Sequence, residues 1–121
     1  MWDYRNLDVW KRAIDLIKII YDVTRRFPKE EMWALSSQLR RAVISISANI
    51  AEGCGRRTSK DYIAFLHNAS GSVKEVESEL FAAAELGYIG RDELNGLLKE
   101  LGEIGRMISG VIEYVSGKDI K

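Results

Sequence analysis

Four stretches of about twenty residues carry apolar side chains three and four positions apart, and this spacing constrains the fold more than any other feature. They cover residues 7–26, 31–53, 60–86 and 92–116. Each stretch predicts an amphipathic helix, because three and four residues is the repeat of one helix face. The connections near 27–31, 53–59 and 87–91 are short, which favours antiparallel neighbours. The sequence therefore predicts an all-α fold, an antiparallel up-down-up-down four-helix bundle that forms one domain over residues 1–121.

Each segment has an apolar line that we expect to face the core, and its ends carry residues that suit helix termini. Pro28 disfavours helical backbone at the residue before it and so ends the first helix. Asn6 is suited to cap the first helix and Thr58 or Ser59 the third, and Gly87 is suited to end the third. The four expected core lines are Leu7, Trp10, Ile14, Ile17 and Tyr21, with Ala13, Ile20 and Val23 as neighbours; Leu35, Leu39, Val43, Ile46 and Ile50; Tyr62, Leu66, Ala69, Val73, Val76, Leu80 and Ala83; and Leu94, Leu97, Leu101, Ile104, Ile108, Val111 and Val115.

The second and fourth segments carry features that a lone bundle does not need. The second has a further apolar line, Ile44, Ala48 and Ala51, so we expect it to contact two partners, the core and a neighbouring subunit. The fourth contains four glycines, which make it a poor helix on its own. We therefore expect tertiary or subunit packing to hold this segment, whose glycines are Gly96, Gly102, Gly105 and Gly110.

Composition indicates a soluble, cytoplasmic protein. The single cysteine excludes an internal disulfide framework and suits a reducing compartment. The first residues, MWDYRNLDVWKR, contain no apolar signal-peptide core. No run approaches the ~18 apolar residues of a membrane helix, so no membrane partner is expected.

Charge is balanced over the chain but not along it. Residues 1–60 hold 12 Lys/Arg against 7 Asp/Glu, and residues 61–121 hold 6 against 11. This asymmetry fits a basic surface for nucleic acid or one pole of a self-complementary assembly. Alternatively, the two halves cancel once the helices lie side by side.

The stretch NIAEGCGRRTSKDY contains a Gly-Cys-Gly triplet with the one cysteine at its centre. A phosphate loop follows a strand, whereas Gly53 and Gly55 follow a helix, so a C-cap with left-handed glycine is the favoured interpretation. Cys54 lacks a nearby base, because His67 lies far into the next helix. One cysteine and one histidine cannot build a zinc site. A phosphate contact with Arg56, Arg57 and the amides of the next helix stays open.

Other catalytic patterns are incomplete. A di-metal bundle uses paired Glu-x-x-His motifs, and position 64, three before His67, is alanine. Glu100 and Glu103 form one Glu-x-x-Glu without a second, and Glu75 and Glu79 are interpreted as solvated charge. We therefore predict no enzyme, no catalytic residue, no cofactor and no metal.

The strongest indication of function in the sequence is a set of basic residues. Asn49 and Glu52 lie on an otherwise apolar helix, where an unpaired buried polar group is costly. We favour a structural role for them over ligand binding. In that role they form hydrogen bonds with backbone groups at the turn or pair with Arg56. The predicted nucleic-acid site gathers at one end of the bundle, where it would contact phosphates without reading sequence. The alternative is ordinary surface charge. The five residues of this predicted site are Arg40, Arg41, Arg56, Arg57 and Lys60.

From LDVWKRAIDL through ELGYI the chain resembles the four-helix family of rRNA intervening-sequence proteins, also called the S23 ribosomal protein family. Accessory variability proteins of diversity-generating retroelements are similar to that family. Two positions depart from the family pattern: Ser47 replaces a frequent proline and Cys54 a frequent aromatic residue. The residues that carry the resemblance are Gln38, Leu39, Arg40, Arg41, Ala42, Ser45, Ile46, Asn49, Ile50, Ala51, Glu52, Gly53, Gly55, Arg56, Arg57, Phe65, Leu66, Gly71, Ser72, Glu75 and Glu77.

This resemblance implies an antiparallel bundle that assembles as a homopentamer with a central pore. In the retroelement branch it implies binding of RNA or DNA and a reverse transcriptase as partner. The expected function is a non-enzymatic homo-oligomeric adaptor that binds structured RNA. The alternative function is a protein–protein interaction scaffold without nucleic-acid binding.

Overall fold

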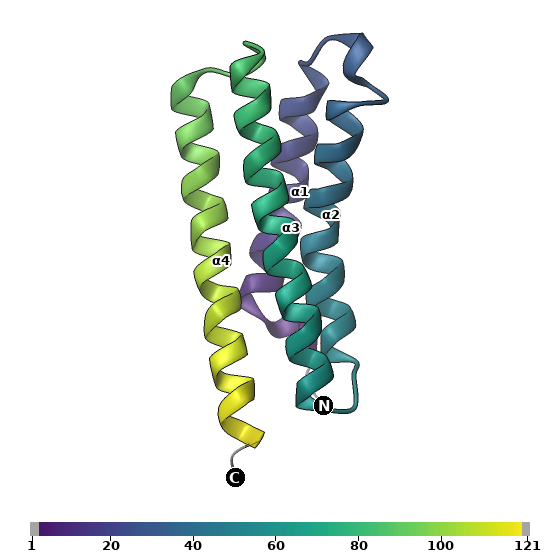
Figure 1. The fold of residues 1–121 in the computed structure, drawn as a ribbon, viewed down its shortest axis with the longest axis vertical. Helices are drawn as coiled ribbons and strands as arrows, with labels where there is room; N and C mark the ends of the chain where they lie inside the picture. Colours follow the sequence, from purple (N-terminus) through teal and green to yellow (C-terminus); the bar gives the residue numbers. More distant parts are fainter. Residues whose placement is uncertain (1–2, 120–121) are drawn as a thin grey trace.

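The computed structural model describes residues 3–119, which form four long helices that run alternately up and down (Figure 1). Both ends of the described chain lie at the same end of the bundle. The predicted all-α, up-down-up-down four-helix bundle is confirmed. The α-helices are α1 (Asp8–Arg25), α2 (Leu35–Cys54), α3 (Ser59–Glu85) and α4 (Arg91–Asp119), and two short 3-10 helices, η1 (Tyr4–Asn6) and η2 (Lys29–Glu31), precede α1 and α2.

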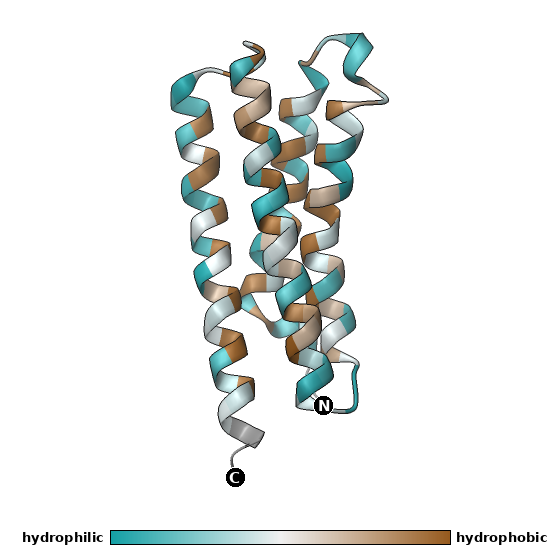
Figure 2. Ribbon diagram, viewed as in Figure 1, coloured by the Kyte–Doolittle hydropathy of each residue, from teal (hydrophilic) through white to brown (hydrophobic). Residues whose placement is uncertain are grey.

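The core lies where the apolar sides of the four helices meet (Figure 2). The expected core lines of α2, α3 and α4 are confirmed, apart from Leu35 and Val111, which are only partly buried. In α1 the expectation is confirmed for Ala13, Ile20 and Val23, which are buried, and wrong for Ile14. Its buried residues are Val9, Ala13, Leu16, Ile20, Val23 and Thr24, whereas Leu7, Trp10, Ile17 and Tyr21 are half-buried and Ile14 is exposed.

The starts of α1 and α2 differ from the predictions. Pro28 is followed by η2, and α2 begins at Leu35 rather than near residue 31. The Leu35 N–H donates to the Glu31 carboxylate (3.3 Å), so the Glu31 side chain provides a hydrogen-bond acceptor for the first residue of α2. Leu7, not Asn6, is the N-cap residue of α1.

The two predicted termini of α3 agree with the structure. Thr58 caps its start by accepting a hydrogen bond from the Asp61 N–H (3.1 Å). At its other end Gly87 has φ +80°, the left-handed conformation that glycine adopts without strain. The Tyr88 N–H donates to the Ala83 carbonyl and the Gly87 N–H to the Ala84 carbonyl, the pattern of a Schellman motif.

Consecutive helices are neighbours, and α4 closes the bundle against α1 through side chains. The Arg12 guanidinium donates two hydrogen bonds to the Glu100 carboxylate (2.7 and 3.0 Å), and Arg26 pairs with Glu93. The first half of the chain, through α2, therefore forms one side of the bundle and α3 with α4 the other. The charge asymmetry of the sequence is an asymmetry between these two sides.

Candidate nucleic-acid interface

The turn between α2 and α3 is tightly packed rather than open. Gly53 lies inside α2 and is buried, and Gly55 caps the helix with φ −84°. The predicted left-handed cap is therefore wrong for both glycines. A Cβ at residue 53 would lie 2.9 Å from the Phe65 Cβ and 2.9 Å from the Tyr62 Cδ1. Gly53 is thus required by the close approach of α2 to α3.

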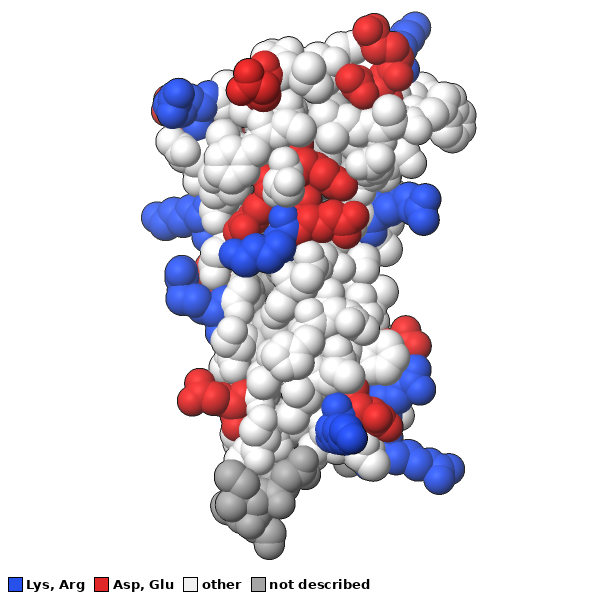
Figure 3. Space-filling view, in the orientation of Figure 1, with Lys and Arg blue, Asp and Glu red and all other residues white. Residues whose placement is uncertain are grey.

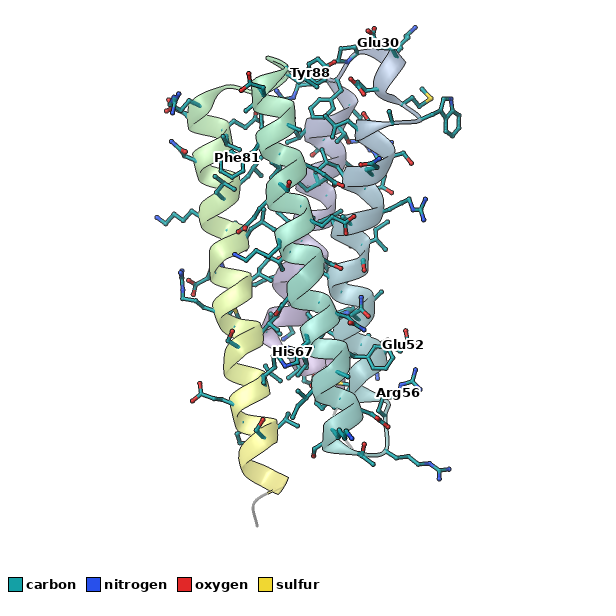
Figure 4. All side chains as sticks on the ribbon, viewed as in Figure 1. Glu30, Glu52, Arg56, His67, Phe81 and Tyr88 are labelled. Carbon is teal, nitrogen blue, oxygen red and sulfur yellow. The ribbon has the colours of Figure 1, made fainter. Side chains whose placement is uncertain are left out.

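Cys54 belongs to this packed turn. It is buried, and its Sγ lies 3.2 Å from the hydroxyl of buried Tyr62, a hydrogen bond in which either group can donate. Burial raises the pKa of the Cys54 thiol. A raised pKa is the opposite of what a nucleophilic cysteine needs, and His67 is exposed on the next helix (Figure 4). The cysteine is a packing residue.

Arg56 is held against this turn by two neighbours. Its guanidinium donates to the Glu52 carboxylate at 2.8 Å and lies over the Phe65 ring, 4.5 Å from the centroid (Figure 4). Glu52 thus makes one of the structural contacts expected from the sequence. Both partners of this ion pair are substantially exposed, so the pair contributes little to stability.

Arg57 and Lys60 extend the same basic end of the bundle. Both are exposed, and no ion pair among the described residues includes either of them. Thr58 lies between them and uses its side chain to cap α3. This end of the bundle therefore carries two exposed cations that no described carboxylate pairs with.

The structure does not bring Arg40 and Arg41 to that end. They lie fifteen or more residues before Arg56, on the order of 24 Å away at 1.5 Å per helical residue. Arg40 is half-buried: its Nε donates to the Thr24 hydroxyl (2.8 Å), and its guanidinium lies over the Tyr21 ring. Arg41 is exposed. The prediction of five cations gathered at one end is therefore wrong for these two.

Asn49 joins a polar contact between α2 and α3 that the sequence did not reveal. Its amide donates to the Ser45 carbonyl (2.9 Å) and hydroxyl (3.0 Å), and the Ser72 hydroxyl of α3 donates to the Ser45 hydroxyl (2.9 Å). Asn49 therefore forms its hydrogen bonds with Ser45, one helical turn earlier in α2, and not with backbone groups of the α2–α3 connection. The sequence does contain an indication of this contact, because Ser45 and Ser72 each stand next to an expected core residue of their helix.

Acidic side chains gather over the middle of α3 (Figure 3). Glu75 is exposed, but Glu79 is half-buried, and its Oε1 is a buried atom that lacks a hydrogen-bond partner among the described residues. Burial, and secondarily the Glu75 charge, raise the pKa of Glu79 to about 7. The interpretation of both residues as solvated charge is therefore wrong for Glu79.

Residues 3–119 contain neither a cluster of metal ligands nor a membrane-spanning helix. Among them, no three His, Cys, Asp or Glu side chains come together as metal ligands would. None of the helices described has the length and apolar content needed to cross a bilayer.

One comparison with known proteins identifies a family, and another finds a similar fold. The family model of 23S rRNA-intervening sequence proteins matches residues 5–110. The fold is similar to a crystal structure from Bacteroides thetaiotaomicron, described as a protein of unknown function from the S23 ribosomal protein family. That likeness has a TM-score of 0.79 and 23% sequence identity, and it covers 86% of this chain and 97% of the other. The search of curated proteins finds no match. Because the family model spans most of the four-helix bundle, this chain belongs to the 23S rRNA-intervening sequence protein family.

Proposed function

We propose that this protein is a non-enzymatic, homo-oligomeric adaptor of the cytoplasm, assembled as a pentamer, that binds structured RNA. The observation that carries the RNA-binding part is the pair of exposed, unmatched cations Arg57 and Lys60 beside Arg56 at the α2–α3 end. Phosphate groups attract such cations without regard to base sequence. A reverse transcriptase gene beside the gene for this chain would point to that enzyme as a partner.

The chemistry of this end favours contact with the RNA backbone over base stacking. Single-strand binders offer aromatic rings on which bases stack. Here Tyr62 is buried, and Phe65 is half-buried beneath the Arg56 guanidinium. Double-stranded RNA is recognised largely through its shape and phosphates. Repetition of a weak site around an oligomer raises the total affinity without a new contact.

A protein–protein scaffold without RNA is the second candidate, and one observation favours it. The connection between η2 and α2, at the opposite end of the bundle, exposes Trp33 (88%) and Met32 (52%). A large exposed apolar side chain beside another is typical of a protein-binding surface. This candidate predicts no RNA binding even at low salt.

Titration of a labelled RNA hairpin at several salt concentrations separates the two candidates. We expect affinity to fall steeply with salt, and the double variant Arg57→Ala/Lys60→Ala to bind about tenfold more weakly, which is about 1.4 kcal/mol. The matched control is Lys29→Ala/Lys99→Ala, which removes the same charge from exposed positions elsewhere. If both double variants lose the same affinity for RNA, binding depends on the net charge of the protein and not on Arg57 and Lys60. If the wild type does not bind RNA even at low salt, the RNA-binding function is excluded.

A further inference from the structure

Trp33 has the most exposed large apolar side chain of residues 3–119, with 88% of its surface in contact with solvent. Met32, the residue before it, is 52% exposed. Trp10, by contrast, is half-buried and packs edge-on against Tyr4, with the ring centroids 5.1 Å apart. No ring contact among residues 3–119 includes Trp33. The bundle therefore does not use this indole for its own packing.

The turn that carries Trp33 is held by hydrogen bonds on both sides of it. The Ala34 N–H donates to the Glu31 carbonyl at 3.0 Å. The Glu31 carboxylate accepts from the Leu35 N–H and, at 2.7 Å, from the Tyr88 hydroxyl, which joins this turn to the α3–α4 connection. A side chain presented on a fixed backbone loses little backbone freedom when a partner binds it.

Carboxylates outnumber cations at the end of the bundle that carries Trp33. We call this the η2 end and define it as residues 26–34 and 85–93. Arg26 pairs with Glu93 there. The charged side chains of the η2 end that take part in no ion pair among the described residues are the carboxylates Glu30, Glu31, Glu85 and Asp92 and the cations Lys29 and Arg91.

This charge favours a protein over RNA as the partner of Trp33. An exposed aromatic ring can stack on a nucleic-acid base, but the phosphates of that nucleic acid would then lie beside Glu30 and Glu31, which directly precede Met32 in the chain. Phosphates bind where cations gather, as at the opposite end of the bundle. Tryptophan and methionine are also enriched at the centres of protein interfaces, where single aromatic anchors supply most of the binding energy.

We propose that Trp33 and Met32 bind a basic segment of another protein, whose apolar side covers these two side chains and whose lysines or arginines pair with carboxylates of the η2 end. Opposite charge would steer that segment to this end and disfavour acidic ones. Because two side chains form a small surface, the contact is of the weak, transient class.

This inference goes beyond the proposed function and does not depend on RNA binding. Arg57 and Lys60 lie in and beside the α2–α3 connection, at the other end of the helix that follows Trp33. The two ends can therefore be occupied at the same time, with RNA at one end and a protein at the other.

A synthetic amphipathic helix of leucine and lysine is the probe for the apolar part of this contact. Its affinity for the full chain is measured by fluorescence anisotropy. We expect Trp33→Ala to weaken binding about thirtyfold, the loss of one interface anchor. Because the Trp33 side chain is almost fully exposed, this variant should fold like the wild type. The matched control is Tyr114→Ala, which removes an aromatic side chain that is 57% exposed near the other end of the bundle and should leave the affinity unchanged.

The charge part is tested at Glu30, whose carboxylate is exposed and has no ion pair among the described residues. We expect Glu30→Lys to weaken binding of the leucine–lysine helix about fivefold, whereas Glu113→Lys, at an exposed position near the other end, should not. A helix of leucine and glutamate should bind the wild type at least tenfold more weakly than the leucine–lysine helix.

Four results would overturn the inference. Two are equal binding of the leucine–lysine helix by Trp33→Ala and the wild type, and equal binding of the two helices by the wild type. A loss of RNA-hairpin affinity in Trp33→Ala would make Trp33 an RNA contact, and a changed mass of this variant in solution would make it a contact between copies. Absence of RNA binding by the wild type excludes the proposed RNA function and leaves the peptide result intact, so the two failures are distinguishable.

Discussion

Replacement of Gly53 by alanine is expected to lower the free energy of unfolding by about 2 kcal/mol, although alanine is the better helix former. The added methyl would lie 2.9 Å from two atoms of α3 and 3.2 Å from the Tyr62 carbonyl oxygen. The Phe65 Cβ and this carbonyl cannot move without the backbone of α3, so the cost is that of overpacking, about 1–3 kcal/mol. Thermal unfolding should show a midpoint lower by roughly 8 °C.

Gly55→Ala is the matched control. A Cβ at this position would lie 3.5 Å from the nearest atom, the Glu52 carbonyl oxygen, and the backbone at Gly55 is right-handed. We expect its unfolding free energy to stay within about 0.5 kcal/mol of the wild type. Equal stability of the two variants would show that α2 and α3 are not in close contact at residue 53.

Glu79→Gln is expected to stabilise the protein above pH 7 and to have little effect near pH 4.5. The pKa of Glu79 rises from its ordinary 4.5 to about 7 in the folded state. Between these values the unfolded chain releases the proton first, so wild-type stability falls as pH rises, and the loss is complete above pH 7. Allowing for partial exposure, we expect a gain of about 1–2 kcal/mol for the variant at pH 8.

Urea unfolding of both proteins between pH 4.5 and 8 measures this effect, since the difference between them removes the titration of other groups. Glu75→Gln is the control: it removes the neighbouring charge, which is the smaller cause of the shift, and should reproduce only a part of the gain. A difference that does not change with pH would mean that Glu79 is solvated when folded.

The sequence predicted helices and their core lines well where one apolar line dominates. In α4 the buried residues follow a heptad, and the structure buries the expected line apart from Val111. In α1 two lines are apolar, and spacing alone does not decide which of them faces the centre. Large side chains such as Tyr21 lie at the edges of the bundle, where Tyr21 contacts Arg40, while smaller ones such as Ala13 face the centre.

The candidate site was less predictable, because it depends on contacts between helices. The separation of Arg40 and Arg41 from Arg56 follows from the helical rise alone and was available beforehand. The stacking of Arg56 on Phe65 and the burial of Glu79 were not, since they depend on how α3 is rotated against α2. Gly53 was misinterpreted for the same reason: its requirement is set by α3, not by the turn after it.

The mass of the wild-type protein in solution tests the central claim that other copies cover the outer sides of this bundle. Light scattering across micromolar concentrations should give a discrete multiple of 13.7 kDa, five copies for the proposed pentamer. A mass of 13.7 kDa at every concentration would contradict the claim.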